Sequence, residues 1–230
     1  MVSVQYVAAT ATDVDLALEL LGGPDRFLPE SVRAAASRHQ REQDRLSYSA
    51  AHALFRLLAV HLLGASPARA AALPVTRSCR TCGSDLHGKP AIDGVELSLS
   101  RSAGAILVAS APAGSPIGAD LERIPEAVFD GFDAYALSEP EREQLLPDDV
   151  DTRLRWWVAK EAVLKATGHG LSFEPQLLTI SGNSCAGLPE AQGLALTWLA
   201  GRTGLAGYAA AIAAPAGQHP ARLALADVLS

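Results

Sequence analysis

Cysteine, positive charge and long apolar runs are all in short supply in this sequence. Three cysteines in 230 residues cannot build a disulfide framework, and they favour a reducing, cytoplasmic setting. No uncharged apolar run reaches the ~18 residues expected of a membrane-spanning helix. The first ten residues lack the basic segment of a secretory signal. The formal charge of −6 argues against a general nucleic-acid binder, whose surface is usually basic. We therefore expect a cytoplasmic protein that binds neither membranes nor nucleic acids.

Lysine is the scarcest of the common charged residues, with 3 lysines against 16 arginines. Arginine evidently serves wherever a solvated positive charge is enough. The remaining lysines therefore mark positions where a compact ammonium is needed in place of a planar guanidinium. They are Lys89 in HGKP, Lys160 in AKEA and Lys165 in LKATG.

Hydrophobic periodicity and turn residues divide the chain into two comparable series of elements. Each series gives a strand, then helices, then a group of strands, and they meet near residues 112–116. We predict an α+β fold of two similar α/β half-domains in tandem, 1–114 and 115–230, each with an antiparallel sheet packed by helices. No residue-level repeat is visible. The expected strands are 3–8, 95–101, 105–112, 115–124, 176–182, 194–200 and 207–214, and the main expected helices are 13–21, two within 29–64, one near 132–146 and 151–168.

The helix around WWVAKEAVLKATG is the clearest of these elements. Glu161 and Lys165 project from its polar face, whereas Lys160 lies at the border of the apolar stripe. Glu161 and Lys165 could be a plain i,i+4 ion pair, worth roughly 0.2–0.5 kcal/mol. That interpretation leaves Lys160 unexplained. The apolar stripe consists of Trp156, Ala159, Ala162, Val163 and Ala166.

Two acidic residues stand two apart in GADLERI. On a strand, Asp120 and Glu122 project from the same face. Adjacent carboxylates repel one another unless a cation lies between them, and Mg²⁺ suits such a site because it takes oxygen ligands together with substrate phosphate. Glu161 could complete the site, and the lysines could neutralise phosphate oxygens. The pattern indicates chemistry on a phosphate ester or anhydride; the alternative is a solvated strand edge.

Five motifs in order resemble one known family. The segment with Gly118, Asp120 and Glu122 matches G-x-D-x-E, and the lysine helix matches W-x-x-K-E-x-x-x-K-x-x-G-x-G-L through Leu171. HGKP matches an upstream Gly-Lys-Pro, LSLSRS falls at S-x-S-H-S, and LSEPE supplies a short acidic motif at Glu141. From about Arg45 to Leu171 the chain resembles the 4′-phosphopantetheinyl transferases of the larger, surfactin-synthetase-activating type. Its CRTCG segment is similar to those of some actinobacterial members.

The resemblance implies an enzyme, a holo-acyl-carrier-protein synthase. It would move 4′-phosphopantetheine from coenzyme A to a serine of an apo acyl or peptidyl carrier protein and release adenosine 3′,5′-bisphosphate. The cleft between the halves would bind coenzyme A. Asp120, Glu122 and Glu161 would hold Mg²⁺, or Mn²⁺, and Glu161 would also accept the serine proton. Lys165 would stabilise charge on the diphosphate. The carriers would serve fatty-acid, polyketide or nonribosomal-peptide synthesis, and the two-half type predicts a monomer.

The resemblance also assigns coenzyme A contacts outside the acidic cluster. The implied contacts are Arg45, Lys89, Pro90, Arg101, Ser102, Lys160, Lys165 and Gly170. Lys89 would touch the nucleotide end. Arg101 departs from the family, which has histidine there. Arginine can keep a phosphate contact, but it cannot exchange a proton near neutral pH.

Two other functions compete with this hypothesis. A Mg²⁺-dependent phosphohydrolase would use the same acids and lysines, but no nucleophile motif is evident. A zinc-stabilised binding module would use Cys79 and Cys82, which have metal-knuckle spacing, together with His87. A structural zinc site needs four ligands, and Cys185 is remote in sequence. We therefore expect a turn with free thiols there.

Overall fold

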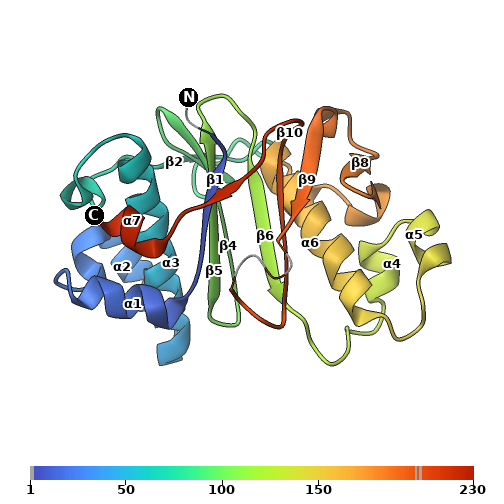
Figure 1. Ribbon diagram of the computed structural model, residues 1–230, viewed down its shortest axis with the longest axis horizontal. Helices are drawn as coiled ribbons and strands as arrows, with labels where there is room; N and C mark the ends of the chain where they lie inside the picture. Colours follow the sequence, from blue (N-terminus) through green and yellow to red (C-terminus); the bar gives the residue numbers. More distant parts are fainter. Residues whose placement is uncertain (1–2, 200, 202–203) are drawn as a thin grey trace.

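Two small β-sheets face each other across a shared core and are covered by helices on their outer faces (Figure 1). The computed structural model describes residues 3–199, 201 and 204–230. One sheet has the strand order β11-β1-β5-β4, and the other has the order β6-β10-β9. Helices α1, α3 and α7 cover the first sheet, and α6 covers the second. The mixed α and β composition agrees with the sequence prediction.

The elements follow one another along the chain with short connections. The strands are β1 (Gln5–Thr10), β2 (Thr76–Ser78), β3 (Lys89–Ala91), β4 (Val95–Ser102), β5 (Ala105–Pro112), β6 (Gly118–Arg123), β7 (Thr179–Ser181), β8 (Ser184–Ala186), β9 (Leu194–Trp198), β10 (Tyr208–Pro215) and β11 (Ala221–Arg222). The helices are α1 (Ala11–Glu19), α2 (Glu30–Ala36), α3 (Glu42–Leu62), α4 (Phe132–Ala136), α5 (Glu139–Gln144), α6 (Val150–Thr167) and α7 (Leu225–Leu229). Ala200, the last residue of one expected strand, lies outside the described residues. None of the described helices has the length and apolarity needed to span a bilayer.

Alternation along β5 explains how one strand serves two cores. Ile106 and Val108 face the helices, whereas Leu107 and Ala109 face the second sheet. All four are fully buried. Because successive side chains of a strand point to opposite faces, a run without polar residues is what a strand covered on both sides requires.

The two sheets meet along β4 and β6 through serine side chains. The hydroxyls of Ser98, Ser100 and Ser102 accept hydrogen bonds from the backbone N–H groups of residues 119, 121 and 123, at 2.9, 3.3 and 3.3 Å. We call these three residues the serine seam. The alternation in LSLSRS places leucines toward the helices and serines toward β6. The serine hydroxyls therefore bond to the β6 backbone where a neighbouring strand of the same sheet would use its carbonyl oxygens.

Helix α6 is buried on nearly every side. The Asp149 side chain caps its start by accepting from the N–H of Thr152 at 2.9 Å, and Gly168 ends it with φ of 77°. The expected polar face is wrong, because Glu161 is only 9% exposed and faces β6 instead of water. Strand and helix approach closely at Gly118, where a Cβ atom would lie 1.9 Å from the carbonyl oxygen of Ala162.

The last residues return to the first sheet. β11 pairs with β1 in parallel, with Gln5 opposite Ala221, so this sheet is mixed and not purely antiparallel as expected. Val228 of α7 is fully buried in the core beneath α3. The C-terminal segment, red in Figure 1, crosses from β10 to the far side of the molecule. The division at residue 114 therefore does not separate two independent cores, and the repeat of two similar halves stays a prediction.

Candidate active site

Three carboxylates gather where β6 faces α6. Asp120 and Glu122 pair with Ala211 and Ala209 of β10, whose side chains belong to the core that α6 covers. They therefore share the face of the sheet toward Glu161. The serine seam orients both: Ser100 donates to Asp120 Oδ1 at 2.7 Å and Ser102 donates to Glu122 Oε2 at 2.6 Å.

The site leaves carboxylate oxygens without partners. Asp120 Oδ2 and Glu161 Oε1 are buried and accept no hydrogen bond. The pKa of Glu161 is raised from 4.5 to about 7, mainly by burial and next by the charge of Asp120, with a smaller contribution from Glu122 and an opposing one from Lys165. Burial is also the main cause that raises the pKa of Glu122. Unpaired, mutually repelling oxygens are the donor set that a hard divalent cation would satisfy. The three residues thus fit the predicted Mg²⁺ site.

Among the described residues, the carboxylates of Asp120, Glu122 and Glu161 lie farther apart than the ligand atoms of a second candidate metal site. Only Cys79, Cys82 and His87 bring three ligand atoms within 4.8 Å of one another. The acids interact electrostatically but do not form so compact a group.

Lys165 pairs with Asp120 and not with Glu161. Its Nζ lies 2.6 Å from Asp120 Oδ1, and the lysine side chain is 28% exposed. The i,i+4 pair weighed from the sequence is therefore absent among the described ion pairs. Lys165 also lines the neighbouring cleft, so one ammonium connects the acidic cluster with the space where a ligand would lie.

Lys160 is placed away from the cleft. Its side chain is 0% exposed, and Nζ lies 2.5 Å from Glu141 Oε2 and donates to the carbonyl oxygen of Ala136 at 2.7 Å. Glu141 also accepts from the backbone N–H groups of Ser138 and Ile180, each at 2.8 Å. The implied contact of Lys160 with coenzyme A has no support in this geometry. The pair instead fastens α6 to α5 and β7.

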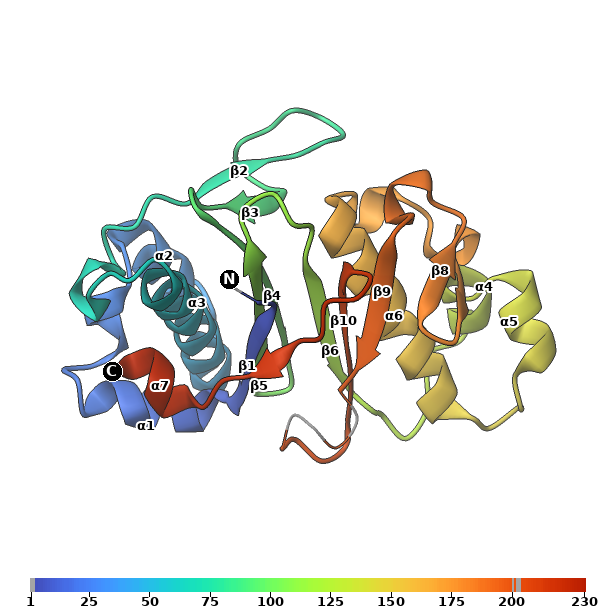
Figure 2. The same cartoon turned by 45° about the horizontal axis from the view of Figure 1, so that its top comes forward.

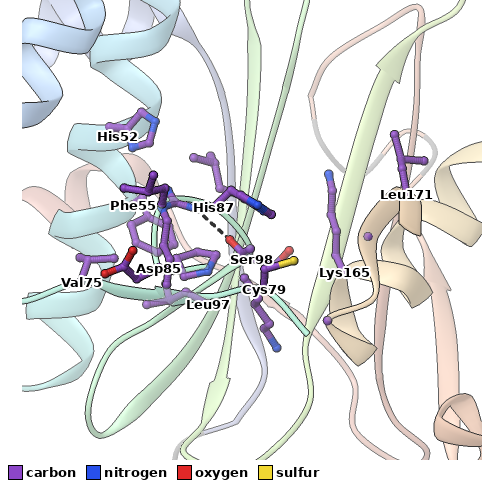
Figure 3. Close-up of a pocket in the computed structure, with 18 of the residues that line it drawn as sticks. His52, Phe55, Val75, Cys79, Asp85, His87, Leu97, Ser98, Lys165 and Leu171 are labelled. Carbon is purple, nitrogen blue, oxygen red and sulfur yellow. Dashed lines mark hydrogen bonds between the residues drawn. The ribbon is translucent and has the colours of Figure 1, made fainter. Parts of the chain in front are cut away.

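A large cleft opens beside the acidic cluster. Its volume is about 1200 Å³. Figure 3 shows Lys165 and Leu171 on one side, with His52, Phe55 and Val75 on the other. Basic and aromatic side chains recur among the lining residues: Arg38, Tyr48, His52, Phe55, Arg56, Arg77, His87, Lys89, Lys165 and His169. A cleft of this size and charge suits an anionic, nucleotide-sized ligand.

The lowered pKa of His52 reflects both its burial and the positive charges around this cleft. Burial lowers its pKa to about 4, with Arg77, Arg101 and Arg56 adding to the effect. Arg56 donates hydrogen bonds to the carbonyl oxygens of Ala70 and Leu73, at 3.0 and 2.8 Å. Because these partners are neutral, the positive charge of Arg56 can still attract an anion.

The structure divides the remaining implied contacts between the cleft and its surroundings. Lys89, Pro90 and Gly170 line the cleft, and Lys89 forms an ion pair with Glu96 at 3.2 Å. Arg101 is exposed and stacks over the Tyr48 ring at 5.4 Å. Arg45 donates to the carbonyl oxygen of His39 at 3.3 Å. Neither of these arginines is among the lining residues, although Tyr48 is.

Several lining residues were not expected from the sequence. Arg38, Arg56 and Arg77 belong to different elements, and no shared spacing links them. Because the chain has 16 arginines, the presence of one arginine at a given position does not indicate a binding site. Tyr48 and His52, one turn apart on α3 with ring centroids 4.3 Å apart, were the pair that helical spacing could have indicated.

Comparison with protein families places the acidic cluster inside a known domain. Residues 116–213 match the model of the 4′-phosphopantetheinyl transferase superfamily. The match contains Asp120, Glu122, Glu161 and Lys165, whereas Lys89 and the arginines of the cleft lie outside it. No curated protein is similar enough to match the chain. Residues 116–213 are thus similar to this superfamily, and most of the opposite wall of the cleft comes from residues before the matched segment.

Proposed function

We propose that this chain, which carries a 4′-phosphopantetheinyl transferase superfamily domain, moves 4′-phosphopantetheine from coenzyme A to a serine of an apo carrier protein. The observation that carries the proposal is the position of the acidic cluster. Buried carboxylates with unpaired oxygens adjoin a cleft of about 1200 Å³ lined with basic side chains. Such a site pairs a place for a divalent cation with a place for a nucleotide diphosphate. The active site then lies between the part before residue 114 and the part after it.

The reaction replaces a phosphoanhydride bond of coenzyme A with a phosphate ester bond to the carrier serine. The carrier serine oxygen forms a bond to the phosphorus that bears pantetheine, and the bond from that phosphorus to the bridging anhydride oxygen breaks. Adenosine 3′,5′-bisphosphate leaves with the electron pair. The serine proton passes to a base on the enzyme. Glu161 is suited to accept it, directly or through a water, because its buried carboxylate has an oxygen without a hydrogen-bond partner.

Asp120, Glu122 and Glu161 would hold Mg²⁺, or Mn²⁺. When bound, the cation neutralises charge on the diphosphate oxygens. Ser100 and Ser102 hold the first two carboxylates in place by donating to Asp120 Oδ1 and Glu122 Oε2. Lys165 adds a positive charge at the cleft wall, and a well-placed charged donor of this kind typically contributes ~3 kcal/mol to stabilising the transition state.

The opposite wall would bind the nucleotide end of coenzyme A. Lys89 and Arg77 lie on neighbouring strands of a hairpin, with Arg77 donating to the carbonyl oxygen of Gly88 at 3.0 Å. This contact holds the Gly-Lys-Pro turn in place. His52 stays neutral near pH 7, because its pKa is about 4, so it can donate one hydrogen bond and accept another without adding charge.

The direct test uses purified protein, coenzyme A, Mg²⁺ and several apo carrier proteins, with each carrier weighed by intact mass spectrometry. We expect one phosphopantetheine group per carrier and an equal amount of adenosine 3′,5′-bisphosphate. A carrier whose modified serine is replaced by alanine is the matched control. Failure to modify any of the carriers, or cleavage of coenzyme A at the same rate without a carrier, would contradict the proposal.

A further inference from the structure

We propose a second metal site, for Zn²⁺, in the loop that joins β2 to β3. Its ligands are Cys79 Sγ, Cys82 Sγ and His87 Nε2, whose atoms all lie within 4.8 Å of one another. The sequence predicted free thiols here because only three ligands were in view. The structure brings those three to one point, so the proposal goes beyond the transfer reaction and does not depend on it.

The spacing of the ligand atoms suits zinc. Zinc lies ~2.3 Å from sulfur and ~2.0–2.1 Å from nitrogen in tetrahedral sites, which puts a sulfur and a nitrogen ligand ~3.6 Å apart. Cys82 Sγ and His87 Nε2 are 3.4 Å apart. Thiolate and imidazole ligands select zinc over Mg²⁺, which prefers oxygen. The loop and the acidic cluster would therefore take different metals.

The backbone of the loop holds the two cysteines on one side. Gly83 has φ of 71° and donates its N–H to the carbonyl oxygen of Cys79 at 2.8 Å, while the Cys79 N–H donates to Ser84 at 2.9 Å.

The fourth position is open to solvent. Cys82 and His87 are exposed, and the described residues supply no fourth ligand to this group. A site with three protein ligands keeps water in the remaining position. All three ligands line the cleft, and Figure 3 shows Cys79 and His87 between its two sides.

The metal would stiffen a loop that bridges the cleft. Figure 2 shows the loop between β2 and β3 reaching toward the end of α6. Arg80 donates to the carbonyl oxygen of Thr167 at 2.7 Å, and Thr81 donates to Ser172 Oγ at 2.9 Å. Both contacts come from residues between the two cysteine ligands. Fixing the cysteines therefore fixes the contacts that tie this loop to the transferase domain.

The test measures metal binding and not activity. Protein stripped with a chelator and kept reduced is titrated with Zn²⁺ in competition with a chromophoric chelator, and separately with Co²⁺. We expect one Zn²⁺ per chain, thiolate-to-cobalt charge-transfer bands and the visible bands of tetrahedral Co²⁺. Cys79→Ser and Cys82→Ser should each weaken Zn²⁺ binding at least ~100-fold, and His87→Ala at least ~10-fold, because each removes one of three ligands. Cys185→Ser, which alters the remaining cysteine, should bind as the unmodified protein does.

A second measurement covers the case in which a variant fails to fold. In the unmodified protein, Zn²⁺ should slow alkylation of Cys79 and Cys82 and leave the alkylation rate of Cys185 unchanged, and it should slow proteolysis between residues 79 and 88. Absence of Zn²⁺ binding by the reduced protein would overturn the proposal. So would cobalt bands that persist in the Cys79→Ser, Cys82→Ser double variant, or a Cys79–Cys82 disulfide that resists reduction and excludes metal.

Discussion

Glu161 is both a buried carboxylate and the proposed general base and metal ligand. It is an acid on a helix that the sequence presents as half polar, yet it faces two other carboxylates and is only 9% exposed. Replacing it with glutamine keeps the shape and removes the charge. Glu161→Gln should lower phosphopantetheine transfer by at least ~100-fold, because it removes both a metal ligand and a general base. Intact mass of the carrier after timed reactions measures this.

The same variant should not unfold the protein. Because it removes repulsion with Asp120 and Glu122, the melting temperature without metal should equal or exceed that of the unmodified protein near pH 8. Glu19→Gln, an exposed change on α1 at the far side of the molecule (Figure 1), is the matched control and should keep full activity. Unchanged transfer in Glu161→Gln would assign this acid a structural role only.

The ionisation of Glu161 also sets a pH dependence. Its pKa in the folded protein is about 7 against an ordinary value of 4.5, so the folded state binds the proton more tightly than the unfolded state does. Stability from this group is therefore lost as pH rises from about 4.5 to about 7, and the loss is complete above that range. The difference corresponds to about 3 kcal/mol.

A divalent cation should offset that loss where the carboxylates are ionised. We expect Mg²⁺ to raise the melting temperature more near pH 8 than near pH 5.5, since protons compete with the metal at the lower pH. Scanning calorimetry with Mg²⁺ and with a chelator at both values measures this. An equal shift at the two pH values, or an undiminished shift in Glu161→Gln, would contradict the site.

At the scale of elements, α6 depends on one buried ion pair. Lys160 and Glu141 are 0% and 2% exposed, and removing one partner of such a pair usually costs about 3–5 kcal/mol. Lys160→Met should lower the free energy of unfolding by that amount in urea titrations. Arg155→Met, an exposed change on the same helix, should cost less than about 1 kcal/mol. A small cost for Lys160→Met would show that the pair adds little to stability.

The packing of β6 on α6 depends on a missing side chain. An alanine at Gly118 would place its Cβ 1.9 Å from the carbonyl oxygen of Ala162 and 2.4 Å from the N atom of Ala166. Because both are helix backbone, the helix must shift. Gly118→Ala should cost about 1–3 kcal/mol and reduce Mg²⁺ affinity, since Asp120 and Glu161 lie on the two displaced elements.

Gly104 offers the comparison. A Cβ there meets nothing within 4 Å, although φ is 82°. Gly104→Ala should cost about 1 kcal/mol of backbone strain and leave Mg²⁺ affinity unchanged. Equal effects of the two variants on metal affinity, measured by calorimetric titration, would argue against a close contact that positions the site.

The sequence predicted most of these elements because their signals are local. Alternation predicted β4, β5 and β6, and Gly168 predicted the end of α6. Lys160 was misassigned because motif spacing says nothing about burial, and its partner Glu141 lies on another helix. The arginines of the cleft and β11 could not be predicted, because each depends on contacts between segments far apart in the chain.

At the scale of the whole molecule, the serine seam both joins the sheets and orients the acids. Losing the Ser98 or Ser100 hydroxyl leaves a buried backbone N–H without its acceptor, which costs about 1–3 kcal/mol. Ser98→Ala and Ser100→Ala should therefore destabilise the protein alike. Only Ser100→Ala should also change Mg²⁺ affinity, because Ser100 alone of the two donates to Asp120. Chemical denaturation and calorimetric titration separate the effects, and equal metal affinities would show that the seam is only structural.

The pairing of Gln5 with Ala221 has a consequence for how the protein is made. The first sheet pairs two segments that are far apart in the chain, and its core includes Val228. A nascent chain on the ribosome can form α3 and the β4–β5 hairpin early, but this core stays incomplete until residues 221–229 have also emerged. The apolar face of the first sheet therefore needs protection until then.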